Sequence, residues 1–261
     1  FDAARHRVPY AEMAEIDRFM LHRLQYLIAR LRGAFARHEY HVFFHSFHNF
    51  CVVDLSSFYL DVLKDRLYTE RADAAGRRAA QTVLHELLSA MVRLMAPILS
   101  FTAEEIWEHL PNKDEEAPSV HCALLPEVNE AWRDAELAAS WEELLAVRSE
   151  VSKALENARR DKRIGGSLEA HVDLFVADGS VPILDRYAED LWELFIVSSA
   201  HVHRDQAPSP AAYTSEAVAG LAVDILPATG EKCERCWTIA STIGSDARYP
   251  TVCARCAARL S

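Results

Sequence analysis

The sequence predicts a mostly α-helical protein, in which an antiparallel helical bundle is followed by a small α+β unit and a four-cysteine zinc hairpin. Three observations support this. Apolar residues recur every three or four positions through residues 11–109, the period changes to two after Gly166, and two Cys-x-x-Cys pairs lie near the carboxy end. We expect three parts: a helical domain (1–130), a long helix with a small α+β domain (131–226) and a zinc-binding tail (227–261).

The bundle is predicted from three long helical patterns. Residues 11–37 place apolar side chains on one face, and residues 41–53 and 57–67 continue the helical pattern. Between these last two stretches, residues 54–57 predict a kink or a cap that restarts the helix. Residues 72–95 form the third long pattern. Short connections between such helices are typical of an antiparallel bundle.

The bundle is expected to end in a short helix and a linker. Thr102 is predicted to cap a helix over residues 103–109, and Pro111 to stop it. Residues 112–129 contain two prolines and an acidic run, which is typical of a linker. The acidic run is Asp114, Glu115 and Glu116.

The next part combines a long helix with strands. A helix is predicted over residues 134–163, with Gly165 and Gly166 as its C-cap signal. Residues 170–176 alternate between apolar and other side chains, as a half-buried strand does. We expect a helix over residues 181–189, then two more strands. These strands are residues 194–203 and the stretch that contains Leu221, Val223 and Ile225.

The last thirty residues predict a structural zinc site. The pairs Cys233/Cys236 and Cys253/Cys256 are separated by sixteen residues, a spacing typical of four thiolates on one zinc ion. Such a site holds shape and leaves no position open for catalysis. We expect Trp237 to help form its apolar floor, together with Ile239. Two disulfides are the alternative, but paired Cys-x-x-Cys motifs without a secretory context favour metal.

Arginines on the first long helix allow two interpretations. Arg23, Arg30 and Arg37 are seven residues apart and border the apolar face, and Arg18 precedes them. They either shield the core from water with their aliphatic stems or form a row of guanidinium groups for phosphates. A second basic run ends the helix over residues 134–163.

The remaining features are less specific. Net charge is −11, but residues 103–193 carry 22 acidic and 9 basic side chains, so the rest of the chain sums to +2. A basic surface outside the acidic middle is therefore possible.

No membrane span or secretory leader is evident, and we expect a cytoplasmic monomer. Cys51 is predicted to be a buried inert thiol. The histidines at 41, 45 and 48 share a helical face with nothing nearby to complete a metal site.

No motif for nucleotide phosphates, a nucleophile elbow or a zinc protease occurs in the sequence. Composition and spacing alone therefore predict a helical bundle, a mixed unit and a zinc hairpin, and no specific function. A freestanding zinc-stabilised adaptor that binds protein or RNA remains compatible with them.

Four stretches together resemble the class I aminoacyl-tRNA synthetases. DLSSFYLDVLKDRLY (54–68) and MAPILSFTAEEIWEHLP (95–111) are similar to the anticodon-binding helices of the isoleucine, valine and leucine enzymes. RIGGSLEA (163–170) and GEKCERCW (230–237), with the second cysteine pair, resemble the bacterial isoleucine branch. The His-x-Gly-His and Lys-Met-Ser-Lys-Ser signatures of the catalytic core in that family do not occur in the sequence, nor does its editing domain.

The resemblance implies a region that binds the anticodon arm of tRNA(Ile) and positions the tRNA for ATP-dependent aminoacylation. The catalytic and editing domains of the same polypeptide would be its partners, and one structural Zn²⁺ its cofactor. A valine or leucine relative is the alternative. The implied tRNA contacts are Arg18, Arg23, Arg30, Arg37, Arg159, Arg160, Lys162, Arg163, Lys232, Arg235, Trp237, Arg248 and Arg255. For base stacking, Phe47 and Tyr68 are further candidates beside Trp237.

Overall fold

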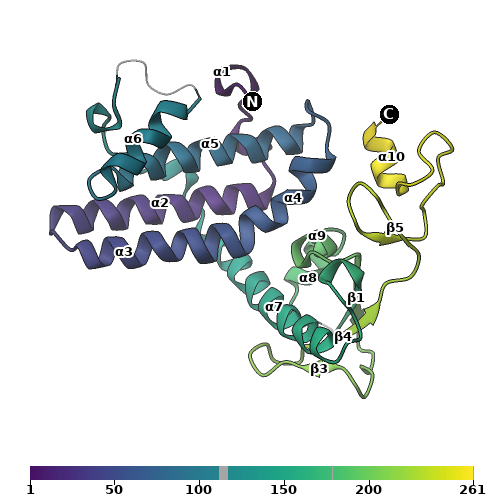
Figure 1. Cartoon of the computed structure of the whole chain (residues 1–261). Coiled ribbons are helices and arrows are strands. Elements are labelled where there is room, and N and C mark those ends of the chain that lie inside the picture. Colours follow the sequence, from purple (N-terminus) through teal and green to yellow (C-terminus); the bar gives the residue numbers. More distant parts are fainter. Residues whose placement is uncertain (112–116, 178, 261) are drawn as a thin grey trace. The chain divides into compact units, whose positions relative to one another are not determined.

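The computed structural model describes residues 1–111, 117–177 and 179–260 (Figure 1). The chain forms two compact units, residues 1–138 and residues 139–261. The predicted acidic run of the linker, residues 114–116, lies outside the described residues. The division into three parts stays a prediction.

The first unit is helical, as predicted. Figure 1 shows α2 between α3 and α5, and these three helices form the body of the bundle. Its helices are α1 (Ala3–His6), α2 (Glu15–Ala36), α3 (Tyr40–Asn49), a π-helix (Phe50–Tyr59), α4 (Leu60–Thr69), α5 (Ala75–Met95) and α6 (Ser100–His109). Among its described residues, short 3-10 turns accompany them at Tyr10–Glu12, Val120–Cys122 and Glu130–Trp132.

The predicted apolar face of α2 is its buried face. Met20, Leu24 and Leu31 are at most 1% exposed, in accordance with their three- and four-residue spacing. The helix ends where His38 adopts a left-handed conformation with φ 57°. The Glu39 N–H then donates to the Ala34 carbonyl at 2.9 Å, which completes a Schellman turn into α3.

Of the two alternatives predicted for residues 54–57, the cap that restarts the helix is wrong. The backbone remains helical there but widens into a π-helix, Phe50–Tyr59, which continues directly into α4. The Ser57 hydroxyl donates to the carbonyls of Val52 and Val53 at 2.8 and 3.0 Å. Ser57 therefore satisfies the carbonyls of the preceding turn instead of capping a new helix.

The predicted cap of the short helix is also wrong, because α6 begins at Ser100 and Thr102 lies within its first turn. Glu104 accepts hydrogen bonds from the Ser119 hydroxyl and the Val120 N–H at 2.8 and 2.9 Å. The carboxylate thus ties the segment after residue 116 to α6, a contact that helix-end rules do not anticipate.

The second unit contains a four-stranded sheet with the order β2-β1-β4-β3. β1 pairs parallel with β2 and antiparallel with β4. Its elements are α7 (Ala135–Arg160, which begins in the first unit), β1 (Ala170–Val176), α8 (Ile183–Arg186), α9 (Leu191–Phe195), β2 (Ser199–Arg204), β3 (Tyr213–Thr214) and β4 (Ala222–Pro227).

Strand β1 confirms the predicted alternation, since Ala170, Val172, Leu174 and Val176 are at most 3% exposed. The strand predicted over residues 194–203 is wrong in its first half. Leu194 and Phe195 belong to α9, and Ile196 ends that helix with φ 57°. The helix predicted over residues 181–189 is confined to the four residues of α8.

The end of α7 differs from the prediction as well. Lys162, not a glycine, takes the left-handed position with φ 59°, and the Arg163 N–H donates to the Ala158 carbonyl at 2.9 Å. Gly166 is extended with φ −143°. The helix is therefore closed before the glycines are reached.

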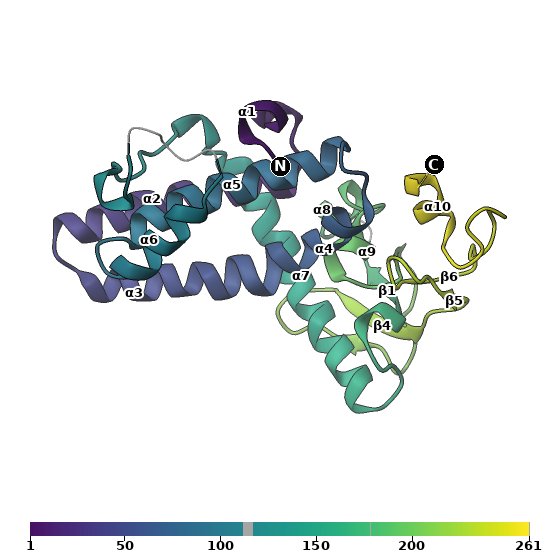
Figure 2. The same cartoon turned by 45° about the horizontal axis from the view of Figure 1, so that its top comes forward.

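The last elements of the chain are β5 (Glu231–Lys232), β6 (Ile239–Ala240) and α10 (Ala254–Leu260), drawn in yellow in Figure 2. Among the described residues, no helix is both long enough and apolar enough to cross a membrane.

Candidate metal centre and nucleic-acid surface

The first cysteine pair lies on the turn of the β5–β6 hairpin. The Cys233 N–H donates to the Thr238 carbonyl and the Trp237 N–H to the Cys233 carbonyl, both at 2.9 Å. These bonds close a tight turn, in which Trp237 adopts φ 67°. Gly230 precedes the hairpin with φ 123°, and a Cβ there would lie 2.5 Å from the Ala240 carbonyl, so the close approach requires glycine.

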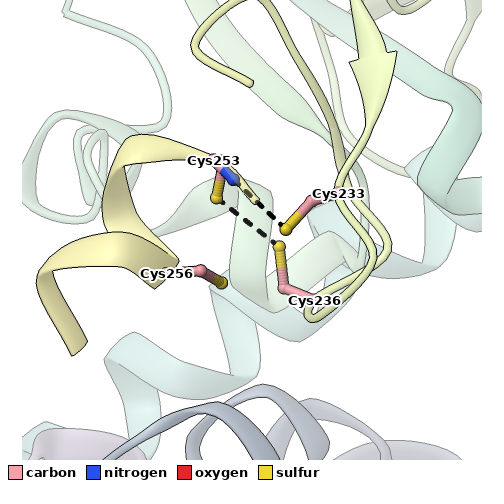
Figure 3. Close-up of side chains that lie close together, drawn as sticks. All are labelled: Cys233, Cys236, Cys253 and Cys256. Carbon is pink, nitrogen blue, oxygen red and sulfur yellow. Dashed lines mark hydrogen bonds between the residues drawn. The ribbon is translucent and has the colours of Figure 1, made fainter. Parts of the chain in front are cut away.

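The second pair lies at the start of α10. Cys253 immediately precedes the helix and Cys256 is in its first turn, where the Ala257 N–H donates to the Cys253 carbonyl at 2.9 Å. Figure 3 shows the four thiols converging from the hairpin and from the helix. Cys233, Cys253 and Cys256 are at most 4% exposed.

The geometry fits one zinc ion. The four Sγ atoms lie within 4.8 Å of one another, and those of Cys236 and Cys253 are 3.8 Å apart. Zn–S bonds of about 2.3 Å in a tetrahedron place sulfurs about 3.8 Å apart. The four cysteines would therefore hold Zn²⁺ with little rearrangement. Bound there, the ion crosslinks the hairpin to α10 and has no open position for water.

The thiols differ in their ease of ionisation. Burial raises the pKa of the Cys233 thiol, but N–H groups of Cys236, Cys253 and Arg235 outweigh it and bring that pKa to about 6. Burial, followed by neighbouring thiols, raises the pKa of Cys256; burial also raises that of Cys253. One thiolate is thus prepared by the backbone, while Cys253 and Cys256 need a cation to favour their ionised forms.

The apolar floor is not the predicted one. Trp237 is 61% exposed, and the residues that pack beneath the cysteines are Val252 and Ala257 with Ala240, Ile243 and Tyr249 at the edge. Ile239 is half-buried, and its N–H donates to the Ser198 hydroxyl at 2.7 Å. Trp237 faces solvent because its left-handed backbone belongs to the turn.

Trp237 instead forms part of an exposed surface. The Lys232 ammonium lies 5.8 Å from the centre of its ring. Both residues line a groove of about 250 Å³ together with the loop Gly166–Glu169. An exposed indole beside a cation is the combination on which an unstacked base can lie. Trp237 and Lys232 were both candidate tRNA contacts in the sequence analysis, but nothing in the sequence indicated that the loop would lie beside them.

The arginine row of α2 makes contacts within its own unit. Arg23 pairs with Asp54 at 2.9 Å, Arg37 with Glu39 at 2.9 Å, and the Arg30 Nε donates to the neutral Ser46 hydroxyl at 2.7 Å. Arg18 lies 3.4 Å from Glu15. The four side chains are therefore held along one helix, and the guanidinium charge of Arg30 is not offset by its serine partner.

The second set of predicted cations is spread over α7, β5, α10 and the segments that connect the elements. Its members contact nearby groups: Arg159 with Glu156, Arg160 with Asn157, Arg163 with the Ile225 carbonyl, Arg248 with Asp246, and Arg255 with the Trp192 ring. Lys162 is exposed at the end of α7, and Arg235 lies between the first two cysteines.

The other candidate residues separate into exposed and packed ones. Tyr68 is 75% exposed, while Phe47 stacks on Phe43 with ring centres 5.3 Å apart. Cys51 is half-buried rather than buried, and burial raises its pKa. Among the described residues, the histidines at 41, 45 and 48 belong to no potential metal group.

Comparison with protein families gives two matches in this chain. Residues 17–174 match the anticodon-binding domain of tRNA ligase, and residues 230–259 match the zinc finger found in FPG and IleRS. The second match contains all four cysteines of the candidate metal centre, which agrees with one structural Zn²⁺.

Curated relatives align with nearly the whole chain. The isoleucine–tRNA ligase of Moorella thermoacetica is 45% identical over 98% of the chain, and that of Geobacter sulfurreducens 45% over 99%. The isoleucine–tRNA ligase of Caldanaerobacter subterraneus is 44% identical over the full chain. The chain spans 27–28% of the length of these relatives.

Proposed function

Because the chain belongs to the family of anticodon-binding domains of tRNA ligases, we propose that it is the tRNA-binding region of an isoleucine–tRNA ligase. It binds the anticodon arm of tRNA(Ile) and positions the tRNA for ATP-dependent aminoacylation in a catalytic domain of the same polypeptide. The single observation that carries this proposal is the succession, in one chain, of the anticodon-binding match and a zinc finger that occurs in isoleucine enzymes. The proposed location is the cytoplasm, and the proposed state is a monomer.

The arginines of α2 suit phosphate binding despite their present partners. Arg37 and Glu39 are 62% and 36% exposed, and exposed ion pairs contribute only about 0–1 kcal/mol to stability, so an RNA phosphate can replace Glu39 at small cost. Arg23 is 39% exposed but its partner Asp54 only 14%, so a phosphate would bind the exposed part of Arg23 and leave that pair intact. Arg30, with its neutral partner, needs no such exchange.

The surface around Trp237 suits an unstacked base. The exposed ring offers a face to a base, and Lys232 beside it offers a charge to the adjoining phosphate. Stacking alone does not distinguish bases, so we assign Trp237 an affinity role and leave discrimination to hydrogen bonds at base edges.

Binding to tRNA(Ile) and to anticodon variants of it tests the proposal directly. We expect filter binding at fixed salt to show weaker binding when anticodon bases are replaced, because the anticodon arm is the recognised part. Equal affinity for all anticodon variants would contradict the proposal and favour the freestanding adaptor. Preference for a valine or leucine tRNA would reassign the chain within the family.

Two variants test the arginines of α2 and the surface around Trp237 separately. Arg23→Glu with Arg30→Glu should weaken binding and reduce the slope of log K against log salt by about 0.7–0.9 for each phosphate that the protein no longer neutralises. Trp237→Ala should weaken binding without changing that slope, since stacking releases no counterions. Arg71→Glu, at an exposed site paired with Asp73, is the matched control and should leave both quantities unchanged.

We also propose that this chain forms no aminoacyl adenylate by itself. Isoleucine-dependent exchange of pyrophosphate into ATP should be at background level with the chain alone. Measurable exchange would overturn this part of the proposal and leave tRNA binding untouched.

A further inference from the structure

The sheet of the second unit has one face that is unusually rich in histidine. In the parallel pair β1–β2, Asp173 is the register partner of His201, and His171 is the partner of Ser199. Because register partners share a face of the sheet, these side chains lie on the face opposite to the buried Val172 and Leu174. This group was not predicted from the sequence, although the two-residue spacing of His171 and Asp173, and of His201 and His203, was a usable signal.

These side chains converge. One ligand atom from each of His171, Asp173 and His201 lies within 4.8 Å of the other two. His203 Nε2 is 2.6 Å and His171 Nε2 3.1 Å from the same carboxylate oxygen, Asp173 Oδ1. The rings of His171 and His201 meet edge to face with centres 4.8 Å apart. Two imidazoles and a carboxylate thus come within a small rearrangement of a common point.

We propose that His171, Asp173 and His201 form a second metal site, which takes one divalent cation of the zinc class and leaves a coordination position open. Imidazole nitrogen and carboxylate oxygen are the ligands that Zn²⁺ and Co²⁺ accept in three-ligand sites. The site is independent of the cysteine centre in chemistry, since it uses no sulfur.

Neighbouring groups support these ligands. The His171 Nδ1 is 2.6 Å from the Ser199 hydroxyl, and an imidazole bonded at one nitrogen is oriented to coordinate through the other. His203, stacked on Phe175, holds the Asp173 carboxylate. Asp224, the register partner of Asp173 on β4, is 8% exposed and adds negative charge to this face. A cation there is favoured by two carboxylates.

The open position has access to solvent. His201 is exposed, and together with Ser199 it lines a cavity of about 400 Å³, whose walls include Trp192 and Arg255. A small anion in the cavity would lie beside His201, one of the three ligands, and near Arg255. Unlike three of the four cysteines, none of these three ligands is fully buried.

Metal stoichiometry tests the proposal on the protein with its cysteine centre already filled with zinc. After equilibration with excess Zn²⁺, elemental analysis should give two zinc ions per chain, and one for the double variant His171→Gln/His201→Gln. Titration with Co²⁺ should yield a visible spectrum without thiolate bands. Ser199→Ala should lower the metal affinity of the second site about 10-fold or more, because it removes the hydroxyl that hydrogen-bonds to the ligand His171.

The control is His45→Gln/His48→Gln, which removes two histidines from α3 and should retain both ions. Thermal unfolding of each variant before metal addition verifies that the fold is intact. One zinc per chain in the unmodified protein, or a second ion unaffected by the His171/His201 double variant, would overturn the proposal. Neither outcome bears on tRNA binding, which is measured separately.

Discussion

The helical unit and the cysteine tail are stabilised in opposite ways. The helical unit buries large apolar side chains almost completely, among them Phe19, Tyr59 and Trp107. The buried cluster of the tail is Cys233, Val252, Cys253, Cys256 and Ala257, so three of its five members are thiols. The helical unit therefore has a hydrophobic core, whereas the tail has a metal site formed by four cysteines.

This difference follows from size. A segment of about thirty residues cannot bury enough apolar surface to offset its conformational entropy, and segments below about 40 residues usually need a metal or disulfides. The helical unit is long enough to bury its own core. We therefore expect metal to control the fold of the tail and to leave the bundle unaffected.

The largest expected effect is on the tail. Removing zinc with a chelator, or replacing Cys256 by serine, should unfold residues 230–260, because structural zinc contributes about 10–16 kcal/mol to small domains of this kind. Amide hydrogen exchange should show loss of protection in the tail and unchanged protection in α2 and α5. Cys122→Ser, at an exposed cysteine outside the cluster, is the control. If the tail kept its hydrogen-exchange protection without metal, the expected difference between the tail and the bundle would be wrong.

The bundle contains a buried ion pair, and breaking it should give the next largest effect. Arg66 donates to both carboxylate oxygens of Asp17 at 2.9 and 3.0 Å, and the Tyr59 hydroxyl donates to the same group at 2.7 Å. Asp17→Ala should lower the free energy of unfolding by about 3–5 kcal/mol, since it leaves a buried guanidinium without its carboxylate. Urea unfolding measures this.

A double variant sharpens that result. Asp17→Leu/Arg66→Met should recover most of the loss, because both charges are then removed from the core. Asp61→Ala, which breaks the exposed pair with Lys64, should change stability little. Equal losses at residues 17 and 61 would show that burial does not govern the energetics of these pairs.

A smaller, pH-dependent effect is expected in the second unit. Glu150 is 1% exposed and accepts from Lys153, Ser215 and Tyr213 at 2.6, 2.7 and 2.9 Å; the Lys153 bond, then the Ser215 bond, lowers its pKa from 4.5. A lowered folded pKa means that the stabilisation is present above pH 4.5 and is lost as pH falls through the folded value.

Glu150→Gln should therefore destabilise the unit by about 1–3 kcal/mol at pH 7, and the difference should shrink as the pH falls below about 4.5. Thermal unfolding of both proteins across this range checks the sign. Glu156→Gln, at an exposed position of the same helix, should show a much smaller difference. If the stability difference between the two proteins increased as the pH fell, it would contradict the lowered pKa assigned to Glu150.

The smallest effects are expected at two exposed helix ends that are closed by non-glycine residues. His38 and Lys162 have φ of 57° and 59°, a left-handed conformation that disfavours side chains. His38→Gly should stabilise the helical unit, and Lys162→Gly the second unit, each by about 0.5–1 kcal/mol. Unfolding midpoints that fell in both variants would show that their side chains contribute more than the backbone strain costs.

The sequence determined those features that depend on nearby residues. The apolar spacing of α2, the alternation of β1 and the spacing of the two cysteine pairs each predicted a structure that was found. The physical reason is periodicity: a helix or strand repeats its orientation at a fixed interval, so one buried face leaves its pattern in the sequence.

Only the tertiary structure decided the choices between locally similar alternatives. Glu104 bonds to residues beyond position 116, Leu194 and Phe195 are buried in α9, and Trp237 lies outside the tail's core. The histidine face required the parallel register that brings residue 171 beside residue 199. Such contacts join residues far apart in the chain, and their energies exceed the small local preferences on which sequence prediction depends.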